Sequence, residues 1–268
     1  MNKKKFYFFI GPCVLESEEL AMQIAEKLAK GFESMSGEVE WVFKGSFDKA
    51  NRTSVNSFRG PGLEKGLLLL EKIKETFKVP VMTDFHLPTQ ALAVACVADI
   101  IQVPAFLCRQ TDMILEGAKA CQKYDRQFNI KKGQFLSPED TKNIIEKASV
   151  YLPREKIILT ERGTSFGYNN LIVDMASFQI MKNFGVKAIY DATHSIQKPG
   201  GLGHMTGGKR GHLKVLARAA VAAGADGIFM ETHPNPEKAK SDSETALPLS
   251  DILPFVVELL KIHRALET

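Results

Sequence analysis

The stretch Val39-Glu40-Trp41-Val42-Phe43 and the loop Lys44-Gly45-Ser46-Phe47-Asp48-Lys49-Ala50-Asn51-Arg52-Thr53-Ser54 that follows it indicate the fold of this chain. The first five residues form an apolar run typical of a buried strand. The loop contains the cations Lys44, Lys49 and Arg52 among small hydroxyl and amide side chains, a mixture that suits phosphate groups. A polar cluster directly after a buried strand is typical of a barrel whose functional residues follow its strands.

The same order of strand and polar loop recurs along the chain. We predict strands at 6–10, 39–44, 79–83, 99–103, 127–131, 156–160, 187–191 and 226–231. Segments with helical periodicity follow them, and we predict helices at 17–35, 63–77, 88–97, 113–123, 137–150, 175–184, 210–223 and 249–266. Ser17 is the expected N-cap of the first helix, whereas Ser137 and Pro138 are expected to open the fifth.

Strict alternation with no long linker predicts an α/β fold, a (β/α)8 TIM barrel in which residues 1–268 form a single domain. An open doubly wound sheet is the alternative, although such a sheet seldom keeps the alternation through eight units. The first strand is also not followed by the Gly-x-Gly-x-x-Gly pattern of a dinucleotide-binding fold.

The composition of the chain limits the classes of molecule that it is expected to bind. The chain has 268 residues and a formal net charge of +4, and its cations gather in strand-end loops, which favours anionic small molecules over nucleic acid. Its four cysteines form no Cys-x-x-Cys pair, so we expect reduced thiols in a cytoplasmic protein. The apolar run at 6–10 is too short for a signal peptide, and no later run is long enough for a membrane helix, so no membrane partner is expected.

Polar residues follow all eight predicted strands. The carboxyl ends of barrel strands meet at one face, so these residues are expected to form one site. In chain order they are Cys13, then 44–54, then Asp84 and His86, then 102–109, then 131–134, then 161–163, then 191–194, and finally 231–233.

A metal site can be chosen from this set. Cys13, His194 and Glu231 follow the first, seventh and eighth strands, which are neighbours once the barrel closes, and Asp242 lies in the last loop. A thiolate, an imidazole and two carboxylates suit Zn²⁺, Fe²⁺ or Mn²⁺. The plain alternative is a buried cysteine beside ordinary strand-end polar groups. His86 and His233 are competing candidates for ligands.

An anion site is the second prediction. We expect five cations from four loops to converge at the barrel mouth: Lys49, Arg52, Arg109, Lys132 and Arg162. Their mutual repulsion calls for anionic ligands, such as a substrate with a phosphate and a carboxylate together with a second phosphate. The glycine-rich segment 198–208 fits either a mobile lid or a surface turn.

These residues carry a family resemblance. The chain resembles the 3-deoxy-D-manno-octulosonate 8-phosphate synthases over nearly its whole length, in the segments 11–13, 47–52, 102–112, 131–136, 160–163, 166–170, 191–195 and 230–234. The related 3-deoxy-D-arabino-heptulosonate 7-phosphate synthases usually have Lys-Pro-Arg-Thr where this chain has Lys49-Ala50-Asn51-Arg52, which favours the octulosonate family. Leu87-Pro88 and Ser243-Glu244 depart from the usual family pattern and concern the shape of two loops.

The resemblance implies condensation of phosphoenolpyruvate with arabinose 5-phosphate, release of inorganic phosphate, and a product for lipopolysaccharide synthesis. It also implies a homotetramer and, since Cys13 follows the first strand, membership of the metal-dependent branch. Rival classes are a metal-dependent hydrolase and a non-catalytic sugar-phosphate sensor.

Site residues are carried over from the same resemblance. The implied metal ligands are Cys13, His194, Glu231 and Asp242. The implied phosphoenolpyruvate contacts are Lys49, Ala105, Arg109, Lys132 and Arg162, with Gln102 as a further substrate contact. The implied sugar-phosphate contacts are Asn51, Arg52 and Ser54. Lys44 and Asp84 are expected at the reacting end, where they complete a catalytic set with Asn51 and His194.

Overall fold

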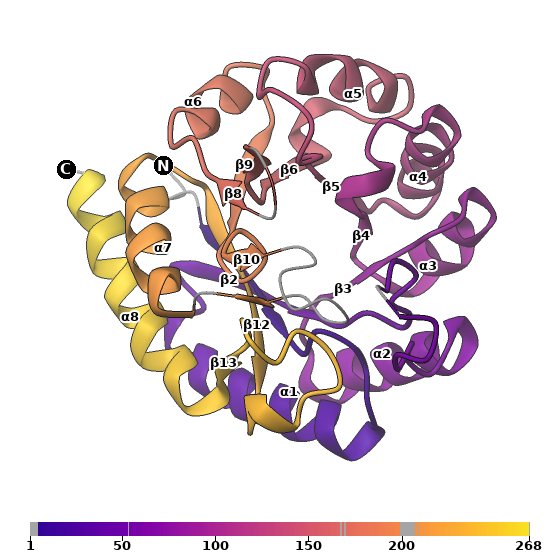
Figure 1. The fold of residues 1–268 in the computed structure, drawn as a ribbon. Coiled ribbons are helices and arrows are strands. Elements are labelled where there is room, and N and C mark those ends of the chain that lie inside the picture. The colour runs from indigo at the N-terminus through magenta and orange to yellow at the C-terminus, as the bar shows by residue number, and fades with distance from the viewer. Residues whose placement is uncertain are drawn as a thin grey trace.

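The computed structural model describes residues 5–52, 54–166, 168, 170–198, 207–208 and 210–267. In this part of the chain, eight parallel strands close into a barrel inside a ring of helices (Figure 1). The barrel strands are β1 (Phe6–Gly11), β2 (Val39–Lys44), β3 (Val81–Asp84), β4 (Ile100–Val103), β5 (Gln127–Lys131), β6 (Ile157–Glu161), β9 (Lys187–Asp191) and β12 (Gly227–His233). Pairing of β1 with both β2 and β12 closes the sheet, which confirms the predicted (β/α)8 barrel.

The helices form the outer layer. They are α1 (Glu18–Phe32), α2 (Leu63–Phe77), α3 (Ala91–Val97), α4 (Thr111–Tyr124), α5 (Thr141–Ala148), α6 (Ser177–Lys182), α7 (Leu213–Ala222) and α8 (Leu249–Leu266). One-turn 3₁₀ helices occur at Glu33–Met35, Pro88–Gln90, Ala105–Leu107, Arg154–Lys156, Arg210–His212 and Pro236–Lys238. Of the described helices, none is both long and apolar enough to cross a membrane.

Two helix starts were predicted from capping residues, and the structure confirms the first but not the second. Ser17 caps α1 as predicted, because its side chain accepts a hydrogen bond from the Leu20 backbone N–H. The helix start predicted at Pro138 is wrong, since α5 begins at Thr141, although the Ser137 hydroxyl accepts a hydrogen bond from the Asp140 amide at 3.3 Å, as a cap would. Residues 138–140 form a turn instead, and both the amide and the hydroxyl of Thr141 donate to the Pro138 carbonyl.

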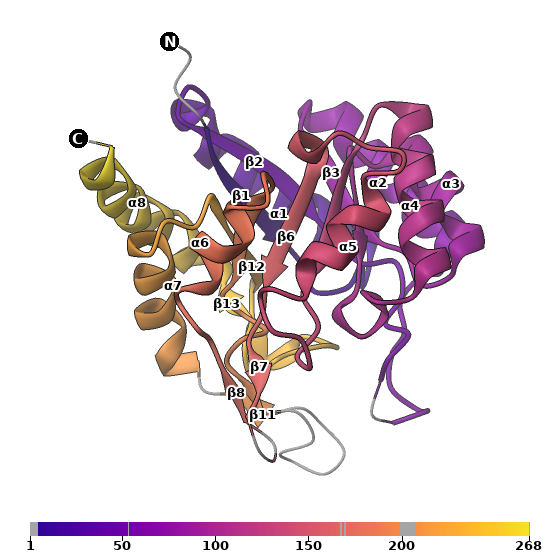
Figure 2. The same ribbon diagram turned by 90° about the horizontal axis from the view of Figure 1, so that it is seen from above.

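Short strands outside the barrel were not predicted. β7 (Thr164–Ser165) pairs with β8 (Leu171–Ile172), β10 (Gln197–Lys198) pairs with β11 (Gly207–Gly208), and β13 (Leu247–Pro248) extends the sheet beside β12. β7, β8 and β11 lie at the end of the barrel opposite the C-terminal end of α8 (Figure 2). Most of the predicted lid, 199–206, lies outside the described residues, as do Thr53, Gly167 and Asn169.

The barrel interior has an apolar layer and a polar layer. The apolar layer consists of Tyr7, Phe9, Val42, Met82, Ile100, Ile158, Ile189 and Phe229. Side chains alternate along a strand, so a residue two positions further on faces the interior as well. On six strands that residue is polar and buried: Lys44, Asp84, Gln102, Thr160, Asp191 and Glu231. The alternation therefore places a polar layer directly on an apolar base, at the carboxyl ends of the strands.

Candidate active site

Two adjoining cavities open at the carboxyl ends of the strands. The first is lined by Lys44, Asp48, Lys49, Asn51, Asp84, His86, Gln102, Pro104, Ala105, Phe106, Lys131, Gln134, Arg162, His194 and Gln197. The second is lined by Lys49, Asn51, Arg52, Ser57, Arg162, His194, Gln197, Glu237, Ala239, Lys240, Ser241, Asp242 and Ser243. Five residues line both, namely Lys49, Asn51, Arg162, His194 and Gln197. The two cavities thus form one continuous site.

The predicted metal ligands lie together. Cys13 Sγ is 2.9 Å from Asp242 Oδ2, and one ligand atom from each of Cys13, Glu231 and Asp242 lies within 4.8 Å of the others. His194 Nε2 is 3.5 Å from Glu231 Oε1 and 3.9 Å from Asp242 Oδ2. Gly11 allows the end of β1, which precedes Cys13, to lie close to the end of β2, because a Cβ at Gly11 would lie 2.0 Å from the Lys44 carbonyl oxygen. The structure therefore brings a thiol, an imidazole and two carboxylates together from three parts of the chain.

The cluster fits a divalent cation on its own chemistry. Glu231 Oε2 is buried and has no hydrogen-bond partner among the residues that the structure describes. Burial, together with the charges of Asp242 and Glu231, raises the pKa of the Cys13 thiol well above its ordinary value. A cation between these groups would satisfy the orphaned oxygen and favour the thiolate, so the residues fit a metal.

Asp191 orients the imidazole of the cluster. His194 Nδ1 lies 2.9 Å from Asp191 Oδ1 and 2.8 Å from Oδ2, which leaves Nε2 facing Glu231. The same carboxylate pairs with Lys131 Nζ at 2.5 Å. Burial raises the pKa of Asp191, but His194 and Lys131 lower it more, so the carboxylate stays ionised. Orientation of a metal-binding histidine by a carboxylate is common in metal sites.

Lys44 and Asp84, the last residues of β2 and β3, lie beside the cluster. Lys44 Nζ is 2.8 Å from Ser46 Oγ, 3.2 Å from Glu231 Oε1 and 4.0 Å from Asp84 Oδ2. Asp84 accepts hydrogen bonds from Ser46 and Gln102. Burial alone would raise the pKa of Asp84, but Lys44 and Lys49 hold it below its ordinary value. Asp84 is therefore an anion at neutral pH.

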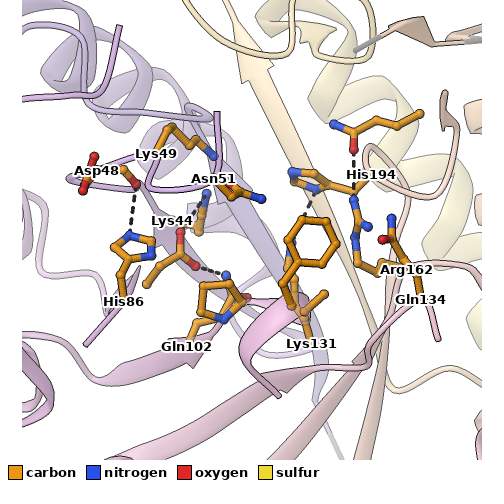
Figure 3. A pocket seen from close by; sticks show the side chains of 15 residues that line it. Lys44, Asp48, Lys49, Asn51, His86, Gln102, Lys131, Gln134, Arg162 and His194 are labelled. Carbon is orange, nitrogen blue, oxygen red and sulfur yellow. Dashed lines mark hydrogen bonds and ion pairs between the residues drawn. The ribbon is translucent and has the colours of Figure 1, made fainter. Parts of the chain in front are cut away.

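Besides Lys44, three buried or half-buried cations line the first cavity from opposite sides. Lys49 lies on the side of β2, while Lys131 and Arg162 lie across the cavity, on the side of β5 and β6 (Figure 3). Lys49 Nζ is 3.7 Å from Glu231 Oε1, and Arg162 donates to Gln197 Oε1 at 2.9 Å. Cations held close together in a buried cavity favour an anion, which offsets their repulsion.

The second cavity contains Asn51 and Arg52 from the loop after β2. Arg52 donates from Nε to the Phe58 carbonyl at 3.0 Å and from Nη2 to the Lys240 carbonyl at 2.9 Å. The guanidinium thus links the loop after β2 to the loop after β12. Ser54 does not line either cavity, and its hydroxyl accepts a hydrogen bond from the Asn56 amide.

Two further predicted contacts lie away from the cavities. Lys132 is fully buried and pairs with Glu161 at 3.4 Å, and it also donates to the Leu136 carbonyl and to Thr164 Oγ1. It follows Lys131 in the chain, so its side chain leaves the strand on the other face. Arg109 is exposed and lines neither cavity, because it follows the 3₁₀ turn Ala105–Leu107, in which Ala105 and Phe106 are the residues that line the first cavity. We therefore replace Lys132 with Lys131 in the candidate site.

The sequence reasoning missed Lys131, Asp191, Gln134 and Gln197 as individual site residues, and it considered His86 only as a metal ligand. His86 lines the first cavity, its Nε2 is 3.1 Å from the Asp48 carbonyl oxygen, and burial lowers its pKa. Strand alternation would have identified Lys131, which shares its face of β5 with Asn129.

Several known proteins are similar to this chain in sequence over nearly its whole length. The chain is 51% identical over 260 residues to a protein of Francisella tularensis subsp. holarctica, covering 97% of this chain and 92% of the relative. It is 51% identical over 261 residues to one of Nitratidesulfovibrio vulgaris (97% and 93%), and 50% identical over 267 residues to one of Dichelobacter nodosus (100% and 92%). All three are named 2-dehydro-3-deoxyphosphooctonate aldolase. Residues 2–266 also match the DAHP synthetase I family, and this chain belongs to that family.

Proposed function

We propose that the protein condenses phosphoenolpyruvate with D-arabinose 5-phosphate and water. The products are 3-deoxy-D-manno-octulosonate 8-phosphate, for lipopolysaccharide biosynthesis, and inorganic phosphate. The observation that carries the proposal is the pair of adjoining cation-lined cavities that meet beside the cluster of Cys13, His194, Glu231 and Asp242. Two phosphorylated substrates need two anion sites with a common reaction centre. The names of the relatives, which specify an eight-carbon phosphorylated sugar acid, support the same choice.

Each cavity is assigned to one substrate. Lys49, Lys131 and Arg162 in the first cavity would bind the phosphate and carboxylate of phosphoenolpyruvate, beside Gln102 and Ala105. In the second cavity, Asn51 and Arg52 would bind the sugar phosphate, which places the aldehyde toward the shared wall. Holding both anions in register supplies the proximity that a reaction between two dissolved molecules lacks.

The reaction forms one carbon–carbon bond and one carbon–oxygen bond to water, and it breaks the carbon–oxygen bond to phosphate. The enol carbon of phosphoenolpyruvate attacks the sugar aldehyde, and water adds to the resulting cationic C2. The tetrahedral intermediate then collapses with loss of phosphate. Lys131 and Arg162 would stabilise the charge on the phosphate during this collapse, and Lys44 would lie at the reacting end with Asp84 as its anionic partner. Zn²⁺, Fe²⁺ or Mn²⁺ held by Cys13, His194, Glu231 and Asp242 would supply Lewis-acid polarisation of the aldehyde oxygen or positioning of water.

The alternative is 3-deoxy-D-arabino-heptulosonate 7-phosphate synthesis from erythrose 4-phosphate. The description of the matched family favours this reading, since it names that class of synthase. The segment Lys49-Ala50-Asn51-Arg52 and the names of the relatives favour the octulosonate product.

Loss of enol absorbance and release of phosphate test the proposal. We expect both only when phosphoenolpyruvate and arabinose 5-phosphate are present together. Consumption of phosphoenolpyruvate without sugar would instead identify a hydrolase. Binding of both compounds with no turnover, in protein loaded with each candidate metal in turn, would identify a sensor.

Assembly and location are also proposed. The homotetramer rests on the family resemblance, and light scattering coupled to size-exclusion chromatography tests it. A cytoplasmic location is supported by the four cysteines, which are all free thiols.

A further inference from the structure

A chain of hydrogen bonds crosses the barrel interior, beginning behind the first cavity and ending at its wall. Thr160 Oγ1 on β6 donates to Asn129 Oδ1 on β5 at 2.8 Å, and Asn129 Nδ2 donates to Gln102 Oε1 on β4 at 2.7 Å. Gln102 Nε2 then donates to Asp84 Oδ1 on β3, a contact that Figure 3 marks at Gln102. Thr160 and Asn129 are fully buried and line neither cavity.

The direction of this chain follows from its anionic end. A carboxylate only accepts hydrogen bonds, so Gln102 must present its N–H to Asp84 and its oxygen to Asn129. Asn129 must then donate its own N–H to Gln102 and turn its oxygen to Thr160. At the far end, the hydroxyl of Thr160 donates to that oxygen. Each link has a single allowed orientation as long as Asp84 is ionised and Thr160 donates.

We propose that Thr160 is a positioning residue, whose hydroxyl hydrogen fixes the orientation of the Asn129 and Gln102 amides and so presents a donor to Asp84. Without that hydrogen, Asn129 Oδ1 loses its donor, and only Asp84 still holds the two amides in this orientation. In the rotated arrangement, the Gln102 amide would donate its N–H to the Asn129 oxygen. The Gln102 oxygen would then face the carboxylate of Asp84. Two acceptors facing each other in a buried site repel, so Asp84 would leave its position.

A displacement of Asp84 would change the arrangement of the groups around the reacting atoms. Asp84 lines the first cavity and also accepts from Ser46, whose hydroxyl is 2.8 Å from Lys44 Nζ. The charged or titratable groups that face Asp84 are Lys44, Lys49, His86 and Lys131. Thr160 pairs with Lys131 across the β5–β6 ladder, but its hydroxyl bonds to Asn129, so the hydrogen-bonded route from Thr160 to Asp84 passes through Asn129 and Gln102. The consequence for catalysis rests on the proposed function, whereas the coupling of Thr160 to Asp84 does not.

Three variants distinguish a positioning role of the Thr160 hydroxyl from a role of its side chain in packing. Thr160→Val keeps the shape of the side chain and removes the hydroxyl, whereas Thr160→Ser keeps the hydroxyl and removes the methyl group. Thr83→Val is the matched control, because Thr83 is also fully buried, precedes Asp84 in β3, and has a hydroxyl with no partner among the described residues. We expect Thr160→Val to lower kcat about tenfold, because the hydrogen bond from the Gln102 amide to the ionised Asp84 would be weakened. Thr160→Ser should recover most of this loss, and Thr83→Val should keep the wild-type kcat.

A double-mutant cycle with Asp84→Asn supplies a readout that needs no activity. An asparagine at position 84 can donate or accept, so either orientation of the Gln102 amide is tolerated there. We expect Thr160→Val to lower the Tm by about 2–4 °C more in the wild-type background than in Asp84→Asn. Equal Tm losses in the two backgrounds would overturn the proposal, as would a wild-type kcat for Thr160→Val or an equal loss of kcat for Thr83→Val. If the protein catalyses another reaction, the cycle still decides whether Thr160 acts on Asp84.

Discussion

Lys131 Nζ lies 2.5 Å from Asp191 Oδ2 inside the barrel, at the wall of the first cavity. Burial lowers the pKa of Lys131, and the charge of Asp191 opposes that effect. The pair therefore keeps a cation where an anionic substrate would enter, and the same carboxylate orients His194. One buried carboxylate thus contacts both a cation of the first cavity and the histidine of the candidate metal site.

The neighbouring lysines on β5 should respond differently to the same substitution. Lys131→Met removes a charge that faces the cavity, so KM for phosphoenolpyruvate should rise on the order of tenfold to a hundredfold. Lys132→Met leaves Glu161 buried without its partner, so the free energy of unfolding should fall by about 3–5 kcal/mol. Steady-state kinetics and urea denaturation of both variants measure these effects. Lys131→Met also removes a partner of the buried Asp191, so its stability should fall as well, and KM is the measurement that separates the two lysines. A rise in KM for Lys132→Met without one for Lys131→Met would contradict the assignment.

Arg52 should act on the sugar phosphate. Arg52→Ala should raise KM for arabinose 5-phosphate by on the order of tenfold to a hundredfold, because a charge-assisted hydrogen bond is worth roughly 1.5–3 kcal/mol. KM for phosphoenolpyruvate should change much less. Arg59→Ala is the control, since Arg59 belongs to the same loop, is half exposed and pairs with Asp48. Equal losses for both substrates would mean that the link to Lys240 holds the loop and that the phosphate contact lies elsewhere.

Removal of the metal should abolish activity. A strong chelator should inactivate the protein, and added divalent metal should restore it. Cys13→Ala should bind metal poorly by elemental analysis and be nearly inactive, whereas Cys121→Ala, which removes another buried free thiol, should keep its metal. Cys13→Asn should retain some activity that resists the chelator, as the metal-independent branch of the family implies. Full activity of a wild-type protein that contains no metal would refute the metal site.

His86 should make stability depend on pH. Burial lowers the pKa of His86 from 6.5, so below that pH the unfolded chain takes up a proton that the folded chain does not. The free energy of unfolding should therefore fall as the pH decreases from about 7 toward 5, since the ordinary pKa of histidine is about 6.5. The fall should be shallower in His86→Gln. Denaturation curves at several pH values test this, and parallel pH dependences for the two proteins would refute it.

Much of the fold could be predicted from the sequence. The strands at 39–44, 127–131 and 187–191 and the helices at 63–77 and 249–266 have the predicted bounds, because each is a long or strongly patterned segment. The start of α5 could not be predicted, because the turn before it depends on the side-chain bond from Thr141 to Pro138. The hairpins β7–β8 and β10–β11 have strands of two residues, too short for any periodicity.

The candidate site could likewise be predicted from the sequence only in part. The cluster of Cys13, His194, Glu231 and Asp242 follows from strand order and closure of the barrel. Choosing Lys131 over Lys132 requires the face of β5, and that face is indicated by the polar residue Asn129 between Phe128 and Ile130. The exposed position of Arg109 depends on the 3₁₀ turn at Ala105–Leu107, which the composition of that segment does not indicate.

The choice of aldose tests the central proposal most directly. kcat/KM should be measured with phosphoenolpyruvate and either D-arabinose 5-phosphate or D-erythrose 4-phosphate, on one preparation of metal-loaded protein. The arrangement of Asn51 and Arg52 around the second cavity, and the names of the relatives, lead us to expect a clear preference for the five-carbon sugar. A higher kcat/KM with erythrose 4-phosphate would contradict the account and make the chain a heptulosonate 7-phosphate synthase.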